Sequence, residues 1–325
     1  MERVLMKILV GPNHIGLENA IPDLQGKFPQ LQFEKCSDRQ KLAGEIVDVD
    51  VYFGWLDESV FFAAEELKWI QSPSSGINHY LAIPELKGSD VLLTSASGTH
   101  ASCVAESALG MIFSFTRGIR HSISAQSEKN WCAREIRSQL SELTDSTMGI
   151  IGFGATGRAL AKRASAFDMR IVAVDLYPMD KPEFVEELWG LDQLHYLLRI
   201  SDYVVVMVPY TEQTKKMIGV HELELMKPSA MLVGMSRGGI IDQRALADAL
   251  NKGAISAAAL DVFDSEPLPE DSELWQLQDL LITPHIAGGT QHEAVYAIQI
   301  FEENLSQFIK GNYNLRNLVD KQLGF

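Results

Sequence analysis

A glycine-rich turn between a strand and a helix constrains the fold of this chain more than any other feature. An apolar run leads into Gly-Phe-Gly-Ala-Thr-Gly at residues 152–157, and small apolar residues then recur at helical spacing. In this strand–turn–helix context the glycine pattern favours a nucleotide-binding turn. Gly152 would permit the tight turn, Gly154 would let a phosphate approach the backbone, and Gly157 would let helix and strand pack closely.

Two further features complete the predicted nucleotide site. The amides of Ala155 and Thr156 begin the helix and would face the phosphates, because a helix N-terminus attracts anions. Asp175 lies 175 − 152 = 23 positions after the first glycine, at the end of the next predicted strand. A carboxylate there accepts from a ribose diol and repels a 2′-phosphate. The sequence therefore predicts NAD (as NADH) rather than NADP, although Lys181 is close enough to weaken the exclusion of phosphate.

The glycine turn belongs to a series of strand-like runs separated by helical stretches. Short connections and strict alternation of this kind predict a doubly wound parallel sheet. The six runs lie at residues 149–152, 170–175, 203–208, 231–235, 257–262 and 280–283.

The N-terminal part predicts a smaller parallel α/β unit, from β-rich runs at residues 7–10, 49–55, 69–72 and 91–94. Apolar residues at helical spacing over 101–113 predict a long helix that enters the second unit, and a second helix within 292–315 is expected to return to the first. We therefore predict a discontinuous domain of residues 1–98 and 292–325, and a nucleotide-binding domain of residues 99–291.

The bulk composition limits the classes of partner. The formal net charge is −15, with 28 basic and 43 acidic residues, which argues against nucleic acid or an anionic membrane as the main partner. No run is long enough to span a bilayer. Three scattered cysteines are too few for a disulfide framework or a zinc site, so we predict no metal and a cytoplasmic location.

Three chemically useful side chains follow predicted strand ends: Arg237, Glu266 and His285. Singly, each has a structural alternative, since an arginine beside glycines can cap a helix and a glutamate before proline is often a turn residue. Together they suit the reduction of a 2-keto acid. A guanidinium holds the substrate, an imidazole moves a proton, and a carboxylate keeps the imidazole charged.

In this order and context the three residues resemble the D-2-hydroxyacid dehydrogenase family. The resemblance extends over nearly the whole chain and includes residues 98–106 and 208–214. It implies an α/β fold of two parallel-sheet domains, a Rossmann-type NAD-binding domain and a smaller flavodoxin-like substrate domain, with a cleft between them.

The resemblance also implies roles for individual residues. Arg237 would bind the substrate's carboxylate or keto oxygen, His285 would be the acid/base, and Glu266 would pair with it. Asp261 would lie near the nicotinamide carboxamide. Further contacts along the cofactor would come from Pro209, Thr214 and Met235.

Residues 74–80 resemble the family's substrate loop, in which the amides of Ser75 and Gly76 would bind the carboxylate. Three positions depart from the family's usual pattern: Ser74 replaces a common glycine, Asn78 a common aspartate, and Gly234 the usual asparagine. These departures leave the identity of the substrate open. Trp55 and Tyr80, expected near the mouth of the cleft, could favour a bulkier side chain.

The sequence therefore predicts an NAD-dependent oxidoreductase that interconverts a small 2-keto acid and its D-2-hydroxy acid, with glyoxylate and hydroxypyruvate as the first substrates to test. One alternative is an NADH-sensing, corepressor-like protein without turnover. The other is a minimal phosphoglycerate dehydrogenase, which should need a basic cluster that the first domain lacks. A homodimer through the 101–113 helix and the loop carrying Trp131 is expected, and His100 is expected to pack or act as a hinge.

Overall fold

The computed structural model describes residues 5–324. The chain divides into two compact units, one of residues 1–100 and 290–325 and one of residues 101–289. We call them unit 1 and unit 2. The corresponding limits predicted from the sequence were 98 and 292 for the first domain, and 99 and 291 for the second.

Unit 1 contains an all-parallel sheet in the order β2-β1-β3-β4-β5, the flavodoxin-like order that the resemblance implied. Its strands are β1 (Met6–Val10), β2 (Leu31–Lys35), β3 (Val51–Phe53), β4 (Trp69–Gln71) and β5 (Leu92–Thr94). Its helices are η1 (Leu17–Ala20), α1 (Ile21–Lys27), α2 (Leu42–Glu45), α3 (Glu58–Ala63), α4 (Asn78–Leu81), α5 (Pro84–Gly88) and α13 (Glu293–Phe308). The sequence pattern did not reveal β2, because this edge strand mixes polar and apolar residues and only its first residue is buried.

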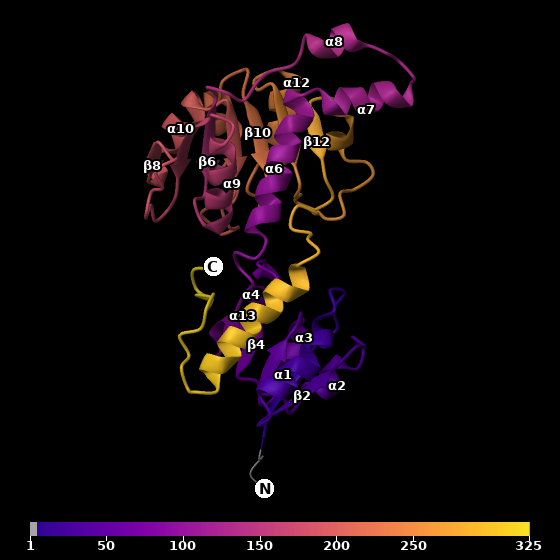
Figure 1. The fold of residues 1–325 in the computed structure, drawn as a ribbon, viewed down its shortest axis with the longest axis vertical. Coiled ribbons are helices and arrows are strands. Elements are labelled where there is room, and N and C mark those ends of the chain that lie inside the picture. Colours follow the sequence, from indigo (N-terminus) through magenta and orange to yellow (C-terminus); the bar gives the residue numbers. More distant parts are fainter. Residues whose placement is uncertain (1–4, 325) are drawn as a thin grey trace. The chain divides into compact units, whose positions relative to one another are not determined.

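The C-terminal helix α13 completes the core of unit 1, and Figure 1 shows it in yellow beside the indigo N-terminal elements. Phe301 on this helix is fully buried. Its ring stacks on Phe53 of β3 and Trp69 of β4, at centroid distances of 4.4 and 5.4 Å. Burying one such aromatic side chain is worth roughly 1.5–3 kcal/mol. The two ends of the chain therefore belong to one folding unit, as the helix predicted for residues 292–315 implied.

Unit 2 contains a second all-parallel sheet, in the order β12-β11-β10-β9-β6-β7-β8. Its strands are β6 (Thr147–Ile151), β7 (Arg170–Val174), β8 (Glu187–Trp189), β9 (Tyr203–Val206), β10 (Met231–Gly234), β11 (Ala257–Leu260) and β12 (Leu280–Ile282). Its helices are α6 (Ala101–Thr116), α7 (Ile119–Ser127), α8 (Ala133–Arg137), α9 (Ala155–Ser165), η2 (Leu191–Gln193), α10 (Leu194–Ile200), α11 (Val220–Leu225), α12 (Gln243–Asn251) and η3 (Glu273–Gln276). The six predicted strands are present. The seventh, β8, is a short and partly exposed edge strand that the apolar pattern did not reveal.

Helices cover both faces of this sheet. Apolar residues of α6 and α9 share one cluster with Ile150 of β6, whereas α10, α11 and α12 share the other with Ile151, the next residue along the same strand. Successive side chains of a strand point to opposite faces, so a strand buried on both faces is apolar throughout. This explains why the central strands read as continuous apolar runs.

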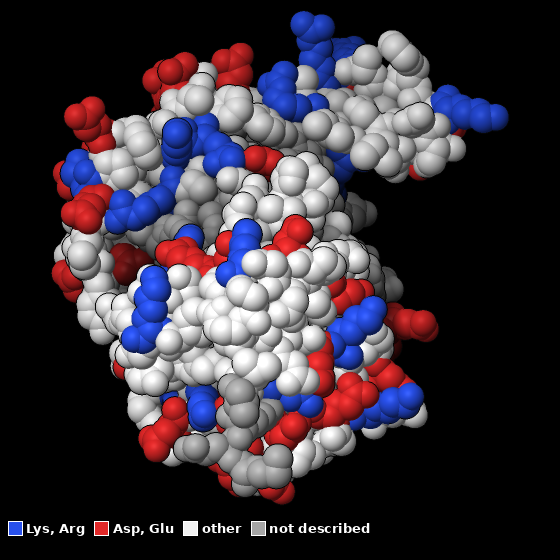
Figure 2. Space-filling model, turned by 60° about the horizontal axis from the view of Figure 1, so that its bottom comes forward, with Lys and Arg blue, Asp and Glu red and all other residues white. Residues whose placement is uncertain are grey.

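The surface is charged and mixed. On the face drawn in Figure 2, acidic and basic side chains are interspersed rather than separated into fields of one sign. None of the helices in residues 5–324 is long and apolar enough to cross a membrane.

Candidate active site

The turn after β6 requires glycine at two of the predicted positions. Gly152 has φ +97°, and an added Cβ would lie 2.9 Å from backbone atoms of Met207 and Val208. At Gly157 an added Cβ would collide with the carbonyl oxygen of Gly152. These two glycines therefore let strand, turn and helix α9 pack closely, which is the role the sequence assigned to them.

Gly154 differs, because an added Cβ there would meet no protein atom within 4 Å. It is the N-cap residue of α9, and no side chain caps this helix. The first amides of α9, including those of Ala155 and Thr156, therefore have no side-chain acceptor within the described residues. A helix start of this kind suits the phosphates of a dinucleotide, so the glycine turn fits the predicted cofactor.

Asp175 lies directly after β7 and is bonded to the glycine turn. One carboxylate oxygen accepts from the amide of Phe153 at 2.6 Å and the other from that of Tyr177 at 2.9 Å. Each carboxylate oxygen can accept a further hydrogen bond, so these contacts leave capacity for a ribose diol. A cation also lies in this region: Arg158 donates to the carbonyls of Met179 and Asp180.

The loop after β9 is held by its own hydroxyl groups. The Thr214 hydroxyl donates to the carbonyl of Pro209 at 2.7 Å and accepts from the amide of Thr211 at 2.8 Å. Met235, just after β10, is buried, and its amide donates to Val206 of β9 at 3.2 Å. These predicted cofactor residues thus follow β9 and β10, and β9 is the strand next to β6.

Three neighbouring strands bring the predicted chemical groups together. Arg237 follows β10, Glu266 follows β11 and His285 follows β12, and these strands are adjacent in the sheet. The imidazole Nδ1 of His285 lies 2.6 Å from Oε2 of Glu266. Oε1 of Glu266 accepts from the amide of Phe263 at 2.9 Å, which fixes the carboxylate. The pairing leaves Nε2 of the imidazole as the nitrogen for proton exchange.

Asp261 organises the loop that carries His285, a role that the sequence pattern did not reveal. The carboxylate is 1% exposed and accepts from the amides of Ile286 and Ala287, both at 3.0 Å, and from the hydroxyl of Thr283. His285 itself has φ +52°, in the left-handed region. The available signal was an aspartate at the end of a fully apolar strand, because a buried carboxylate must be hydrogen-bonded.

The loop that carries Arg237 is held against the loop that carries Glu266. An added Cβ at Gly238 would collide with the carbonyl of Phe263, and the amide of Gly239 donates to Asp264 at 2.7 Å. Burial lowers the pKa of Arg237 from its ordinary value, and the nearby Glu266 carboxylate opposes that shift. An arginine keeps its charge in proteins even so. The sheet therefore holds a partly buried cation near the Glu266–His285 pair.

The predicted substrate loop belongs to unit 1 and follows β4. Ser74, where the resemblance favours a glycine, uses its hydroxyl to donate to the carbonyl of Gly76 at 3.1 Å, and its own carbonyl accepts from Ala96 at 3.0 Å. Ser75 is exposed. The hydroxyl of Ser74 thus takes part in the internal structure of the loop.

Tyr80 and His100 have partners that the sequence did not reveal. Tyr80 is fully buried and its hydroxyl donates to Gly54 at 2.6 Å, so it supports the residues beside Trp55 rather than lining an opening. His100 has an acidic partner that the sequence did not reveal, since its Nε2 lies 3.7 Å from Glu293 of α13. That partner favours the packing or hinge role.

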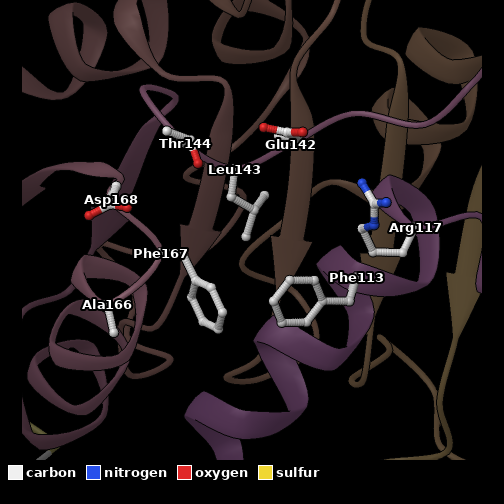
Figure 3. A pocket seen from close by; sticks show the side chains of 8 residues that line it. All are labelled: Phe113, Arg117, Glu142, Leu143, Thr144, Ala166, Phe167 and Asp168. Carbon is white, nitrogen blue, oxygen red and sulfur yellow. The ribbon is translucent and has the colours of Figure 1, made fainter.

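A pocket elsewhere in unit 2 contains none of the predicted site residues. It has a volume of about 300 Å³, and Figure 3 shows Phe113 and Phe167 facing each other across it, with Arg117, Glu142 and Asp168 around them. The two phenyl rings meet edge to face at 5.1 Å. The pocket is a gap between the end of α6 and the end of α9, and it is not part of the candidate active site.

Known proteins resemble this chain over nearly its full length. A glyoxylate reductase of Thermococcus litoralis is 33% identical, over 94% of this chain and 95% of its own length. A D-3-phosphoglycerate dehydrogenase of Methanocaldococcus jannaschii is 30% identical over 98% of this chain, which spans only 62% of that protein. Among solved structures, a D-isomer specific 2-hydroxyacid dehydrogenase of Xanthobacter autotrophicus Py2, in complex with NADPH and MES, has a TM-score of 0.84 at 26% identity, covering 99% of this chain and all of its own.

A family model points to the same conclusion. The model described as "D-isomer specific 2-hydroxyacid dehydrogenase, NAD binding domain" matches residues 109–287, the segment that carries the glycine turn, Arg237, Glu266 and His285. The chain therefore belongs to the D-isomer specific 2-hydroxyacid dehydrogenase family of oxidoreductases.

Proposed function

We propose that this protein reduces a small 2-keto acid to its D-2-hydroxy acid with NADH, and catalyses the reverse reaction with NAD. The observation that carries the proposal is the 2.6 Å contact between His285 and Glu266. These residues follow β12 and β11, and β11 is the neighbour of β10, the strand that precedes Arg237. An acid/base, its orienting carboxylate and a substrate-binding cation are the groups that this reaction requires.

Each residue has a defined part in the proposed reaction. Arg237 binds the substrate's carboxylate or keto oxygen, with a planar guanidinium that can form two parallel hydrogen bonds. The imidazolium of His285 donates its Nε2 proton to the keto oxygen, and Glu266 stabilises that imidazolium and keeps the ring oriented. The dinucleotide supplies the hydride when it is bound, and its phosphates would lie at the turn of residues 152–157. Asp261, Pro209, Thr214 and Met235 would line its remaining length.

The proposed preference for NAD over NADP depends on the carboxylate of Asp175. Its carboxylate is fixed by the amides of Phe153 and Tyr177 and would stand close to a 2′-phosphate, where two negative charges repel. Two cations lie in this region. Arg158 donates to the carbonyls of Met179 and Asp180 in the loop after Asp175, and Lys181 of the same loop donates to the carbonyl of Val185 at 2.8 Å. The related Xanthobacter protein has NADPH bound, so the cofactor must be measured for this chain.

The substrate is proposed to be glyoxylate or hydroxypyruvate, since relatives named glyoxylate reductase match over nearly the full length of both chains. Ser75 and Gly76 would bind the substrate's carboxylate through their amides. One competing function has an observation in its favour: the phosphoglycerate dehydrogenase relative matches 98% of this chain. A protein that senses NADH without turnover is the remaining alternative.

A steady-state substrate panel tests the proposed function. Glyoxylate, hydroxypyruvate, pyruvate and a bulkier 2-keto acid are each assayed with NADH and with NADPH, and 3-phosphoglycerate is assayed with NAD. We expect the highest kcat/KM for one of the two small keto acids with NADH. Dominant oxidation of phosphoglycerate would overturn the substrate proposal, and NADH binding without turnover of any substrate would support the sensor.

We also propose how the protein is organised around this reaction. Residues 99–291 would bind the dinucleotide and supply Arg237, Glu266 and His285, and residues 1–98 with 292–325 would form the substrate domain that supplies Ser75 and Gly76. A homodimer in the cytoplasm is proposed, with an interface formed by α6, α7 and the loop after α7. Trp131 in that loop is 94% exposed and Ile123 of α7 is 62% exposed, which is more apolar surface than an isolated helix pair should present.

A further inference from the structure

We propose that unit 2 holds a second ligand site, for a divalent transition-metal ion, formed by His195, His221 and Glu222. This site goes beyond the proposed function and does not depend on it. One ligand atom from each of these residues lies within 4.8 Å of the other two. His195 belongs to α10, and the other two belong to the first turn of α11. The two helices cover the same face of the sheet.

The carboxylate of the cluster is already oriented. Oε2 of Glu222 accepts from the amide of Gly219 at 3.1 Å and caps α11. The other oxygen, Oε1, lies 3.4 Å from Nε2 of His195. The Glu222 side chain is only 18% exposed, so its packing restricts the direction of the free oxygen. A ligand held by a second hydrogen bond is typical of protein metal sites.

The two imidazoles reach this cluster from different helices, His195 from α10 and His221 from α11. Their ring centroids are 5.1 Å apart with an interplanar angle of 79°. Metal–ligand bonds of ~2.0–2.2 Å place tetrahedral ligand atoms roughly 3.3–3.5 Å apart, which is the separation already present between His195 and Glu222. The longer separations between ligand atoms, up to 4.8 Å, must shorten by as much as roughly 1.5 Å. The His195 side chain is 48% exposed and can make that adjustment by rotation.

The donor set selects the class of ion. Two imidazole nitrogens with one carboxylate oxygen suit Zn²⁺, Ni²⁺ and Cu²⁺, whereas Mg²⁺ and Ca²⁺ prefer oxygen ligands alone. Water would complete the coordination shell. We take Zn²⁺ as the ion to test first, because a mixed nitrogen and oxygen set with four ligands is common for it.

A bound ion would join two parts of the fold that are distant in sequence. In chain order α10 precedes β9 and α11 follows it, so the ion would link two helices that pack on the same face of the sheet. A ligand that binds only the folded state raises its stability with concentration. The expected effect is a melting temperature higher by on the order of 5 °C when free Zn²⁺ exceeds Kd by roughly 100-fold.

The test is a calorimetric titration of the full-length, tag-free protein with Zn²⁺ after removal of metal by a chelator. Wild type should bind one equivalent at this site. His221→Ala and His195→Ala should each lose at least about 10-fold in affinity, together with the thermal shift. Glu222→Gln should weaken Zn²⁺ binding. The amide oxygen of the glutamine can still accept from the amide of Gly219, so unfolding of α11 would not explain the weaker binding. Co²⁺ in place of Zn²⁺ should give a visible absorption band that disappears in the same variants.

Two controls exclude other sources of binding. His121→Ala on α7 removes a histidine outside the cluster and should titrate as wild type. His285→Ala removes the other histidine–carboxylate pair, at the proposed active site, and should also retain the Zn²⁺ equivalent. The proposal is overturned if wild type takes up no Zn²⁺ at about 100 µM, or if His221→Ala and wild type bind with equal affinity and stoichiometry. Either outcome would mean that His195 and Glu222 form an ordinary surface ion pair. Neither outcome would affect the proposed dehydrogenase activity.

Discussion

The Nδ1 atom of His285 and the Oε2 atom of Glu266 are 2.6 Å apart, although 19 positions separate the residues along the chain. The contact exists because β11 and β12 are neighbours, so that the loops that follow them emerge side by side. Glu266 is fixed in turn by the amide of Phe263. The imidazole therefore has one orientation in which Nε2 can reach a substrate oxygen.

The first prediction concerns the pairing of Glu266 with His285. Glu266→Gln keeps a hydrogen-bonding side chain of similar size but removes the charge that stabilises the imidazolium, so kcat should fall by about 10-fold or more. The measurement is steady-state kcat with NADH and the best 2-keto acid, beside NADH affinity, which should stay near the wild-type value. An unchanged kcat in Glu266→Gln would contradict the proposed pairing.

Removal of the imidazole gives the second prediction. His285→Ala should reduce kcat by about 10²-fold or more, the usual contribution of a positioned acid/base, while NADH binding stays near the wild-type value. His121→Ala serves as the matched control and should keep full activity. Near-normal turnover in His285→Ala would remove this residue from the mechanism.

The third prediction tests substrate binding by Arg237. Lysine keeps the charge but cannot form two parallel hydrogen bonds, and losing one charge-assisted bond costs roughly 1.5–3 kcal/mol. Arg237→Lys should therefore lose about 10- to 150-fold in kcat/KM. NADH affinity, measured by fluorescence titration, should change little. A variant with unchanged kcat/KM would show that the guanidinium does not contact the substrate.

The fourth prediction concerns the choice of cofactor. Asp175→Ala should raise kcat/KM for NADPH by on the order of 10-fold, because a carboxylate near a 2′-phosphate costs a few kcal/mol at most at a protein surface. Asp180→Ala, a few residues further along the same loop, is the control. Wild-type enzyme that uses NADPH as well as NADH would refute the role given to Asp175.

The fifth prediction concerns stability and its dependence on pH. Asp242 caps α12 through the amides of Arg244 and Ala245, and its hydrogen bond with Lys216 lowers the pKa of this carboxyl. A lowered folded-state pKa gives stability that is present above the unfolded value of ~3.9 and is lost as pH falls through the folded value. Asp242→Ala should cost about 1 kcal/mol at pH 7. Urea unfolding should show that this difference shrinks in acid, and that Asp242→Asn, which keeps the cap, loses less.

Local sequence determined which segments are strands, turns and helices in most of unit 2. Gly152 must adopt a positive φ, and Gly157 must lie against a backbone carbonyl. Glycine meets both requirements best, so the turn could be predicted from the sequence. Strands buried on both faces are apolar along their whole length, which made the six central runs visible. The edge strands β2 and β8 escaped notice, because a strand with an exposed side need not be apolar.

Tertiary structure alone decided which distant residues meet. The order β12-β11-β10 places the loops of Arg237, Glu266 and His285 together, and no local pattern encodes strand order. The buried carboxylate of Asp261 holds the loop of His285 through the amides of Ile286 and Ala287, and the packing of α10 beside α11 brings His195 to Glu222. Such contacts depend on the burial of apolar helix faces against a sheet, a property of the whole unit, whereas turns and strands depend on the residues that form them.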